Sequence, residues 1–208
     1  MRTYFFQLLI LVFLFSLNSL SAQVSFGASL LLGIPNKITQ TGYGLEGFLE
    51  FKLTEEISAR MTGGIHYTNF EKEGIYDNGL SQNKIYGLII YHPFKNGIDK
   101  IDGMEPYLGL GLGYVSSSYS STHNAQTING GYMYNINIDD ALGYFSVIGI
   151  DIRPLANFHV KAEINYIYLR PNYTYIFESV SPTFRNDLIL EKIDLSYIAC
   201  KLMFVIEL

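Results

Sequence analysis

The sequence contains no tryptophan and a single cysteine, Cys200, among its 208 residues. One thiol excludes an intrachain disulfide, and it also excludes a metal site built from several cysteines. Charged residues make up only 16% of the chain, whereas about a quarter is typical of a globular domain. The formal net charge is −5. Phosphate recognition requires clustered basic residues, and the sequence contains no such cluster. These deficits exclude nucleic acid as a partner.

Long apolar runs are missing beyond the N-terminal region. Arg2 precedes an apolar run over residues 4–17, and the small and polar residues of 18–23 follow it. This pattern predicts a secretory signal peptide, residues 1–22, with cleavage after Ala22; an uncleaved membrane anchor is the alternative. After Gln23 no run reaches the roughly 18–20 residues of a transmembrane helix. We therefore expect residues 23–208 to form one domain without helical spans.

The abundant residues favour sheet structure: the chain has 17 Tyr, 14 Phe and 19 Gly. Aromatic residues prefer strands, and polarity alternates with period two over segments of about ten residues. Eight such segments are found, at residues 24–34, 42–52, 57–70, 84–92, 105–118, 142–153, 158–169 and 191–208. This is the signature of an outer-membrane-type barrel. The predicted fold is all-β: an eight-stranded antiparallel up-and-down transmembrane β-barrel.

The connections between these segments alternate in length. Residues 53–56 and 154–157 are tight turns, whereas 35–41, 71–83, 119–141 and 170–190 are long or polar. The stretch 119–141 is rich in Ser, Asn, Thr and Gly, so we expect it to be the longest exposed loop. With both termini in the periplasm, the short turns lie there and the long loops lie outside. Only residues 93–104 break the pattern, as a periplasmic turn of moderate length.

One segment, 105–118, contains the run PYLGLGLGY, in which leucines alternate with glycines. The leucines would face lipid, and Gly109, Gly111 and Gly113 would face the interior of a tightly curved sheet. We expect these glycines to leave space for large side chains from neighbouring strands.

Charged residues recur at the positions predicted to face inward. On the lipid face a mid-bilayer Arg or Lys would cost about 2–4 kcal/mol, so we predict a salt-bridge network in the lumen. Its members are Glu46, Glu50, Lys52, Arg60, Asp151, Arg153, Lys161, Glu163 and Lys201. The competing interpretation is a soluble β-sandwich with these side chains in solvent.

Tyrosines near the segment ends predict aromatic girdles at the membrane surfaces. The girdle candidates are Tyr43, Tyr67, Tyr91, Tyr107, Tyr114, Tyr144, Tyr166 and Tyr168. Other tyrosines in the long loops could instead form a platform for sugars: Tyr119, Tyr132, Tyr134, Tyr173 and Tyr175.

Groups for chemistry are sparse. None of the four histidines has a second ligand at metal-binding spacing. The stretch His66–Asn69 has only a faint similarity to the motif of a lipid A deacylase barrel, because Thr68 stands where that motif has serine. We therefore expect no catalytic, cofactor-binding or metal-binding residues, and no cofactor.

The signal peptide ending at Ala22, the PYLGLGLGY run and the alternating last strand together resemble a known family. It is the family of small bacterial outer-membrane β-barrels of the OmpA, OmpX and OmpW type, in the porin-like form common in Bacteroidota. The resemblance implies that Leu202, Phe204, Ile206 and Leu208 belong to a C-terminal assembly strand recognised by the barrel-assembly machinery. The family commonly ends in an aromatic residue, whereas this chain ends in Leu208.

These features predict a non-enzymatic protein of the outer membrane of a Gram-negative bacterium. Its lumen would be filled with side chains, and its extracellular loops would contact partners. The expected partners are outer-membrane lipid, lipopolysaccharide and the assembly machinery. The alternatives are a narrow transport barrel for small hydrophobic solutes, an accessory subunit of an envelope complex, and an outer-membrane hydrolase or acyltransferase.

Overall fold

The computed structural model describes residues 23–34, 39–72, 75–94, 103–121, 126–128, 131–155, 157–179 and 186–208. The predicted signal peptide, residues 1–22, lies outside these ranges. The strands are β1 (Val24–Ile34), β2 (Gly42–Lys52), β3 (Ile57–Lys72), β4 (Ile75–Tyr91), β5 (Met104–Ser121), β6 (Gln126–Ile128), β7 (Gly131–Ile138), β8 (Ala141–Leu155), β9 (Phe158–Tyr168), β10 (Asn172–Ser179), β11 (Asn186–Lys192) and β12 (Tyr197–Glu207). No helix within these ranges is long and apolar enough to cross a bilayer.

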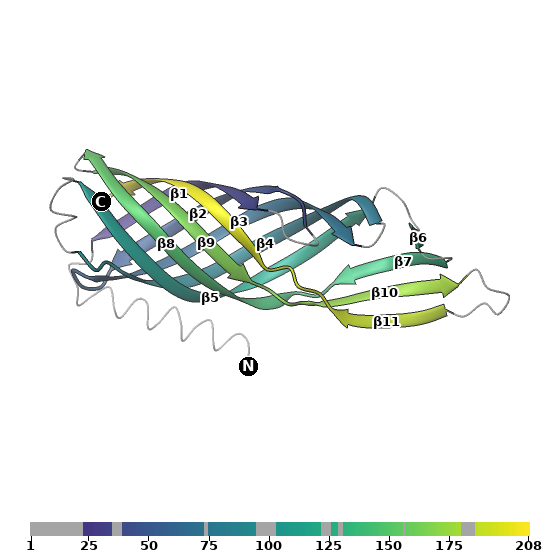
Figure 1. Ribbon diagram of the computed structural model, residues 1–208. Coiled ribbons are helices and arrows are strands. Elements are labelled where there is room, and N and C mark those ends of the chain that lie inside the picture. The colour runs from purple at the N-terminus through teal and green to yellow at the C-terminus, as the bar shows by residue number, and fades with distance from the viewer. Residues whose placement is uncertain are drawn as a thin grey trace.

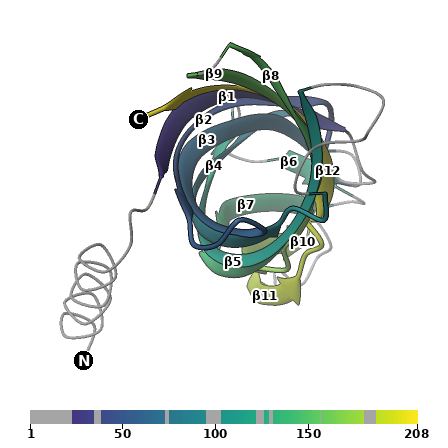
Figure 2. The same cartoon turned by 90° about the vertical axis from the view of Figure 1, so that its left-hand side faces the viewer.

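Eight of the strands close into a barrel, in the order β1-β12-β9-β8-β5-β4-β3-β2 (Figures 1 and 2). Every neighbouring pair is antiparallel, and β1 closes the ring against β12 over Ser25↔Glu207 to Ile34↔Ile198. Because the ring is closed, no barrel strand is left with an unpaired edge inside a membrane. The predicted eight-stranded antiparallel barrel is confirmed.

The side chains of the barrel are arranged inside out compared with a soluble protein. Along β2, residues alternate strictly between buried and exposed from Gly42 to Glu50, so that Leu45 is 65% exposed while its neighbour Glu46 is 4% exposed. The same alternation places Ile148 outward and Val147 inward on β8. A continuous apolar outer wall around a charged interior requires hydrocarbon as its surroundings. The soluble-sandwich alternative is therefore wrong.

The glycines of β5 face inward, as predicted. A Cβ atom at Gly109 would lie 2.8 Å from the Val147 side chain, and one at Gly111 would collide with the backbone of Gly87. At Gly113 the obstacle is Tyr86. The glycines therefore give room for the inward side chains of β4 and β8, which fill the lumen from both sides.

The barrel has a short-turn end and a long-connection end. β2 and β3 are joined by a turn in which the Leu53 and Thr54 amides donate to the Ile57 carbonyl oxygen. The Ile57 amide in turn donates to the Thr54 hydroxyl at 3.0 Å. Because periplasmic turns of such barrels are short, we call this the periplasmic end and the opposite one the extracellular end.

Three of the expected strand boundaries are wrong. Residues 71–83 were expected to be a loop, but β3 and β4 continue into this stretch and pair as far as Lys72↔Ile75. The last strand begins at Tyr197 rather than 191, and β8 extends through Pro154 to Leu155. Backbone pairing depends on the neighbouring strand. Polar residues beyond the membrane therefore stay hydrogen-bonded in a strand wherever a second strand lies beside them.

The long connections 119–141 and 170–190 also contain strands. β11, β10, β7 and β6 form a four-stranded extracellular sheet in that order, which extends beyond the barrel (Figure 1). Tyr173 of β10 is 0% exposed and Ile138 of β7 is 3% exposed. Both belong to one apolar cluster with Leu169, Ile193 and Leu195. The prediction of a loop rested on average composition, whereas a few well-placed apolar side chains are enough to order this sheet.

Candidate functional site

The lumen is the part of the molecule in which polar side chains converge, and Arg60 of β3 lies at its centre. Its Nε–H donates to Glu50 Oε2 at 2.8 Å, and its Nη1 contacts Glu163 of β9. Tyr107 donates to the same Glu163 carboxylate at 2.7 Å. In the ring order, β3 and β9 are four positions apart and therefore lie opposite each other. The Arg60–Glu163 ion pair thus crosses the lumen.

A second ion-pair layer surrounds Glu46 of β2, nearer the extracellular end. Lys84 Nζ lies 3.0 Å from Glu46 Oε1, and Lys201 Nζ lies 2.6 Å from Oε2. The Tyr86 hydroxyl donates to Oε2 at 2.9 Å. Lys84 also donates to the Tyr197 hydroxyl at 3.0 Å. Since β4 and β12 lie opposite in the ring, this contact crosses the lumen at a second level.

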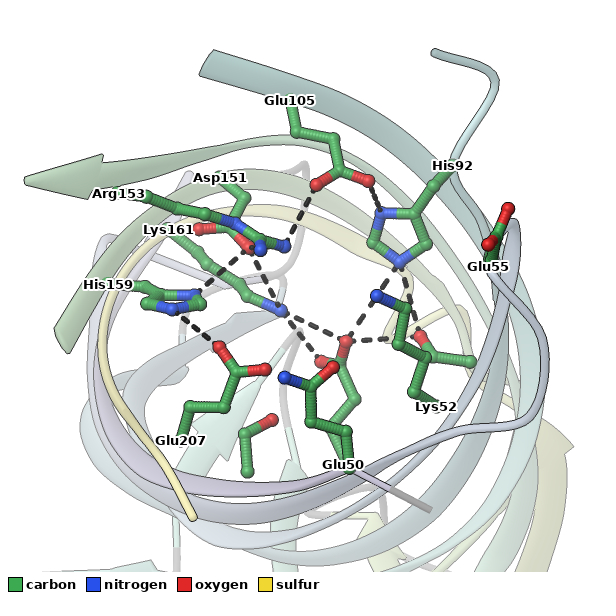
Figure 3. A pocket seen from close by; sticks show the side chains of 13 residues that line it. Glu50, Lys52, Glu55, His92, Glu105, Asp151, Arg153, His159, Lys161 and Glu207 are labelled. Carbon is green, nitrogen blue, oxygen red and sulfur yellow. Dashed lines mark hydrogen bonds and ion pairs between the residues drawn. The ribbon is translucent and has the colours of Figure 1, made fainter. Parts of the chain in front are cut away.

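On the periplasmic side, Lys161 of β9 connects the Arg60 layer to the mouth of the barrel. Its Nζ lies 2.9 Å from Glu50 Oε2 and 3.7 Å from Asp151 Oδ2. Two histidines continue the network at the rim, as Figure 3 shows. His92 Nδ1 lies 3.0 Å from Glu105 Oε1, and His159 Nε2 lies 2.9 Å from Glu207 Oε2. The mouth encloses a pocket of only about 40 Å³.

Apolar side chains occupy the extracellular end of the lumen. Leu80, Val115 and Ile167 are each 1% exposed, and they belong to the same cluster as Tyr173 of the extracellular sheet. The barrel interior and the inner face of the sheet therefore share one apolar core. Among the described residues, side chains therefore fill the lumen at the periplasmic mouth, at the two ion-pair layers and at the apolar cluster.

The nine residues predicted for the lumen network fall into two groups. Seven are buried inside the barrel: Glu46, Glu50, Arg60, Asp151, Lys161, Glu163 and Lys201. The other two, Lys52 and Arg153, are exposed at the periplasmic rim (Figure 3). Arg153 lies 2.9 Å from Glu105 and 3.5 Å from Asp151. Both side chains line the pocket at the mouth of the lumen, and they are exposed because each lies near the end of its strand, where the barrel opens to water.

Lys84 is the buried charge that the sequence analysis missed. Leu88, Ile89 and Ile90 are consecutive apolar residues, so the alternation of this segment did not decide its inner face. With Lys84 included and the buried histidines counted as neutral, the buried charges in the described residues are four acidic (Glu46, Glu50, Asp151, Glu163) and four basic (Arg60, Lys84, Lys161, Lys201). Their formal charges cancel, as a low-dielectric interior requires.

Tyr107 was predicted to belong to a membrane girdle, and this prediction is wrong. It is 2% exposed inside the barrel, where its ring lies 5.6 Å from the Arg60 Cζ atom. Its parity on β5 matches that of Gly109, so counting along the strand would have placed it inside. The other girdle candidates face outward, and Tyr144 and Tyr168 pack against each other with ring centroids 6.0 Å apart.

The tyrosines proposed as a sugar platform include two that are not available on the surface. Tyr173 is 0% and Tyr175 is 9% exposed, because both rings pack in the core of the extracellular sheet. The side chains of Tyr132 and Tyr134 lie outside the described part of the structure. The platform prediction is wrong for the two buried tyrosines.

The His66–Asn69 stretch forms contacts that are structural. The His66 ring stacks on Tyr197 with centroids 4.7 Å apart, and its Nδ1 lies 3.3 Å from Gln82 Oε1. Thr68 donates its hydroxyl hydrogen to the Gln40 carbonyl oxygen at 2.7 Å. In the described ranges, no three His, Cys, Asp or Glu side chains are grouped to hold a metal ion.

The predicted C-terminal assembly strand corresponds to β12, which ends at Glu207. Leu202, Phe204 and Ile206 face outward and are more than two-fifths exposed. Lys201 and Met203 face the lumen. This strand pairs with β1 on one side and β9 on the other, so it completes the ring.

Outside the membrane, an exposed ion pair lies where β9 leads into the extracellular sheet. Arg170 Nη2 donates to Asp194 Oδ2 at 3.2 Å, and the Ser196 amide donates to Oδ1 at 3.0 Å. Hydrogen bonds from Ser196 and from Arg170 lower the pKa of Asp194. The Arg170 guanidinium also lies 5.2 Å from the Tyr168 ring centroid, which connects this pair to the girdle.

Comparison with known proteins identifies the fold. No protein-family model and no curated protein sequence matches the chain. Among solved structures, the outer membrane protein OprG from Pseudomonas aeruginosa matches with a TM-score of 0.66 at 12% identity, over 90% of this chain and 96% of that one. The outer membrane protein AlkL matches at 0.54, with 14% identity over 90% and 89%. A major outer membrane protein from Thermus thermophilus matches at 0.53, with 12% identity over 91% and 100%.

These likenesses and the inside-out arrangement of side chains define the class of protein. The chain has the fold of the small eight-stranded transmembrane barrels of bacterial outer membranes. Sequence identities of 12–14% establish the fold alone, and the features that bear on function are those of the lumen and the surface.

Proposed function

We propose that the protein is a non-enzymatic integral outer-membrane barrel whose wall and filled lumen are a scaffold, and whose extracellular part makes contacts with other molecules. In this proposal residues 1–22 are a signal peptide, β12 is recognised by the barrel-assembly machinery, and outer-membrane lipid and lipopolysaccharide surround the wall. The apolar outer face and the similarity of the fold to outer-membrane proteins support this location.

The observation that carries the proposal is the ion pair between Arg60 and Glu163. It joins opposite walls of an eight-stranded ring, whose interior is only wide enough to be filled by side chains. The side chains of Arg60 and Glu163 are 1% and 0% exposed. A solute would have to break this pair, then the Lys84–Tyr197 contact, and then displace the apolar cluster around Leu80. Such a lumen supports a scaffold better than a transport pathway.

The experiment that tests this proposal is single-channel recording of the purified protein in planar bilayers. We expect no steady conductance above the lipid background, while a general porin recorded under the same conditions conducts. Steady single-channel currents from the protein would contradict the filled-lumen scaffold and favour a narrow transport barrel. A stable complex recovered after purification in mild detergent would instead identify an accessory subunit.

A further inference from the structure

The outer wall carries a groove of about 300 Å³ at its extracellular end. It lies across β2, β3, β4 and β5, next to the extracellular girdle. The residues that line it are Thr41, Tyr43, Tyr67, Thr68, Asn69, Gly79, Leu80, Ser81, Ser118 and Ser120. The outward-facing residues among them take part in none of the lumen contacts given above.

Strand register shows why the groove forms there. Tyr67 pairs with Ser81, which pairs with Ser118, and one step further out Asn69 pairs with Gly79, which pairs with Ser120. These six positions share the outward parity of their strands. Large apolar residues occupy the outer face lower on the same strands, but here the outward residues of β4 and β5 are glycine and serine. The change in side-chain size hollows the wall where it leaves the hydrocarbon.

Gly79 lines the groove and leaves free space where a side chain would stand. A Cβ atom placed there would meet no atom closer than the Ser120 Cβ, at 4.0 Å. A larger side chain at this position would therefore project into the groove without a backbone collision. Gly79 thus offers a way to fill the groove without disturbing the barrel.

The lining of the groove combines two aromatic rings with hydroxyl and amide groups. Tyr43 and Tyr67 are 69% and 45% exposed, and their ring centroids are 5.9 Å apart at an interplanar angle of 34°. The Asn69 amide is oriented by donation to Gln40 Oε1 at 3.3 Å. The hydroxyls of Ser81, Ser118 and Ser120 can each donate and accept hydrogen bonds.

The described residues that line the groove include none with a charged side chain. Recognition of phosphate or sulfate relies on Arg and Lys, so an anionic ligand does not fit this surface. A ligand that matches it needs apolar C–H faces to pack on the two rings and several hydroxyls to pair with serine and amide groups. A neutral pyranose ring has both.

We propose that this groove is a binding site for a neutral saccharide, with Tyr43 and Tyr67 as the stacking surface and Asn69, Ser81, Ser118 and Ser120 as the hydrogen-bonding groups. The inference rests on the proposed function, because it requires that this end of the barrel face the cell exterior. Two sources present such sugars there: the glycolipids of the outer leaflet around the barrel, and glycans of another cell.

The test is to measure saccharide binding by the full mature protein in lipid nanodiscs. One arm uses an array of neutral oligosaccharides, and the other uses calorimetry with the neutral sugar portion of lipopolysaccharide, freed of lipid, phosphate and acidic sugars. Binding in the second arm identifies the surrounding glycolipid as the source, and binding only on the array identifies foreign glycans. We expect Gly79→Leu to weaken whichever binding is found by about tenfold or more.

The chain offers a matched control for this variant. Gly87 lies on the same strand, faces outward in the lipid belt, and also leaves a Cβ free of contacts closer than 4.0 Å, so Gly87→Leu should leave binding unchanged. In a second pair of variants, Tyr43→Ala removes an exposed girdle ring that lines the groove. Its control, Tyr144→Ala, removes an exposed girdle ring outside the groove. Heat-modifiable gel migration verifies that every variant is folded.

Two outcomes overturn the inference: no neutral saccharide binds in either arm, or the affinity is the same in Gly79→Leu and Gly87→Leu. Both outcomes leave the filled-lumen scaffold intact, because the closed lumen is tested independently by conductance. A conducting barrel that still binds a saccharide would overturn the proposed function and leave the groove assignment standing.

Discussion

Arg60 and Glu163 are 103 residues apart in the chain, yet their side chains form an ion pair that joins opposite strands of the barrel. Each is also held by a further partner: Glu50 accepts from Arg60, and Tyr107 donates to Glu163. Buried charges are tolerated only when they are paired and hydrogen-bonded. This pair therefore reports directly on whether the lumen is packed as a unit.

Replacing Arg60 with Gln should destabilise the barrel by about 3–5 kcal/mol, because it leaves Glu50 and Glu163 as under-compensated buried charges. Glu163→Gln should act in the same direction. The measurement is the temperature at which gel migration shifts from the folded to the unfolded form. Arg170→Gln removes an exposed ion pair instead and should change stability by less than about 1 kcal/mol. The double variant Arg60→Gln/Glu163→Gln should lose less than the sum of the singles; full additivity would mean that the pair is not coupled.

Lys84→Met tests whether the buried Lys84, which the alternation of polarity did not predict, stabilises the barrel. Glu46 keeps Lys201 as a partner, so the expected loss is smaller, about 1.5–3 kcal/mol. Lys52→Met, at the exposed rim, should change stability by no more than about 0.5 kcal/mol. Urea titration of the folded fraction in lipid vesicles measures both. Equal effects of the two variants would show that Lys84 is not part of a buried layer.

Gly111→Phe should prevent assembly, because the new side chain would collide with the Gly87 backbone and with Leu88. Gly87→Phe is the matched control, since that position faces outward and its Cβ would have no contact closer than 4.0 Å. Membrane insertion can be followed by protease protection in outer-membrane preparations. Normal insertion of Gly111→Phe would contradict the packed inner face of β5.

Tyr173→Ala should loosen the extracellular sheet while the barrel stays closed. Loss of a buried aromatic ring destabilises a protein by about 3–5 kcal/mol. Here the loss destabilises the core of the sheet around Ile138 and Leu195. Limited proteolysis should then cut within the sheet segments, residues 131–138 and 172–192, while the barrel keeps its heat-modifiable migration. Leu188→Ala is the control, because Leu188 is 73% exposed and should leave the cleavage rate unchanged. Unfolding of the barrel together with the sheet would show that they form one cooperative unit.

The sequence by itself determined the class of fold and most of the lumen. Period-two alternation is a local property, so it assigns each side chain to one of two faces without knowledge of the neighbouring strand. Glu46, Glu50, Arg60, Lys161 and Glu163 were placed inside on that basis alone, and the leucines of β5 were placed outside. Where alternation was interrupted, as at Leu88–Ile90, the pattern predicted neither the inner face of the strand nor the burial of Lys84.

The tertiary structure decided which charges meet, where the strands end and what covers the extracellular mouth. Ring closure brings β3 opposite β9, and no local pattern predicts a contact across 103 residues. The extracellular sheet depends on Tyr173, Ile138 and Leu195 packing together from separate segments, whereas composition averages over a window and misses them. The outer groove at Gly79 has the same origin, because small residues on β4 and β5 form a hollow only when register sets them side by side. Alternation follows from the geometry of one strand, whereas register, closure and packing depend on pairs of strands far apart in the chain.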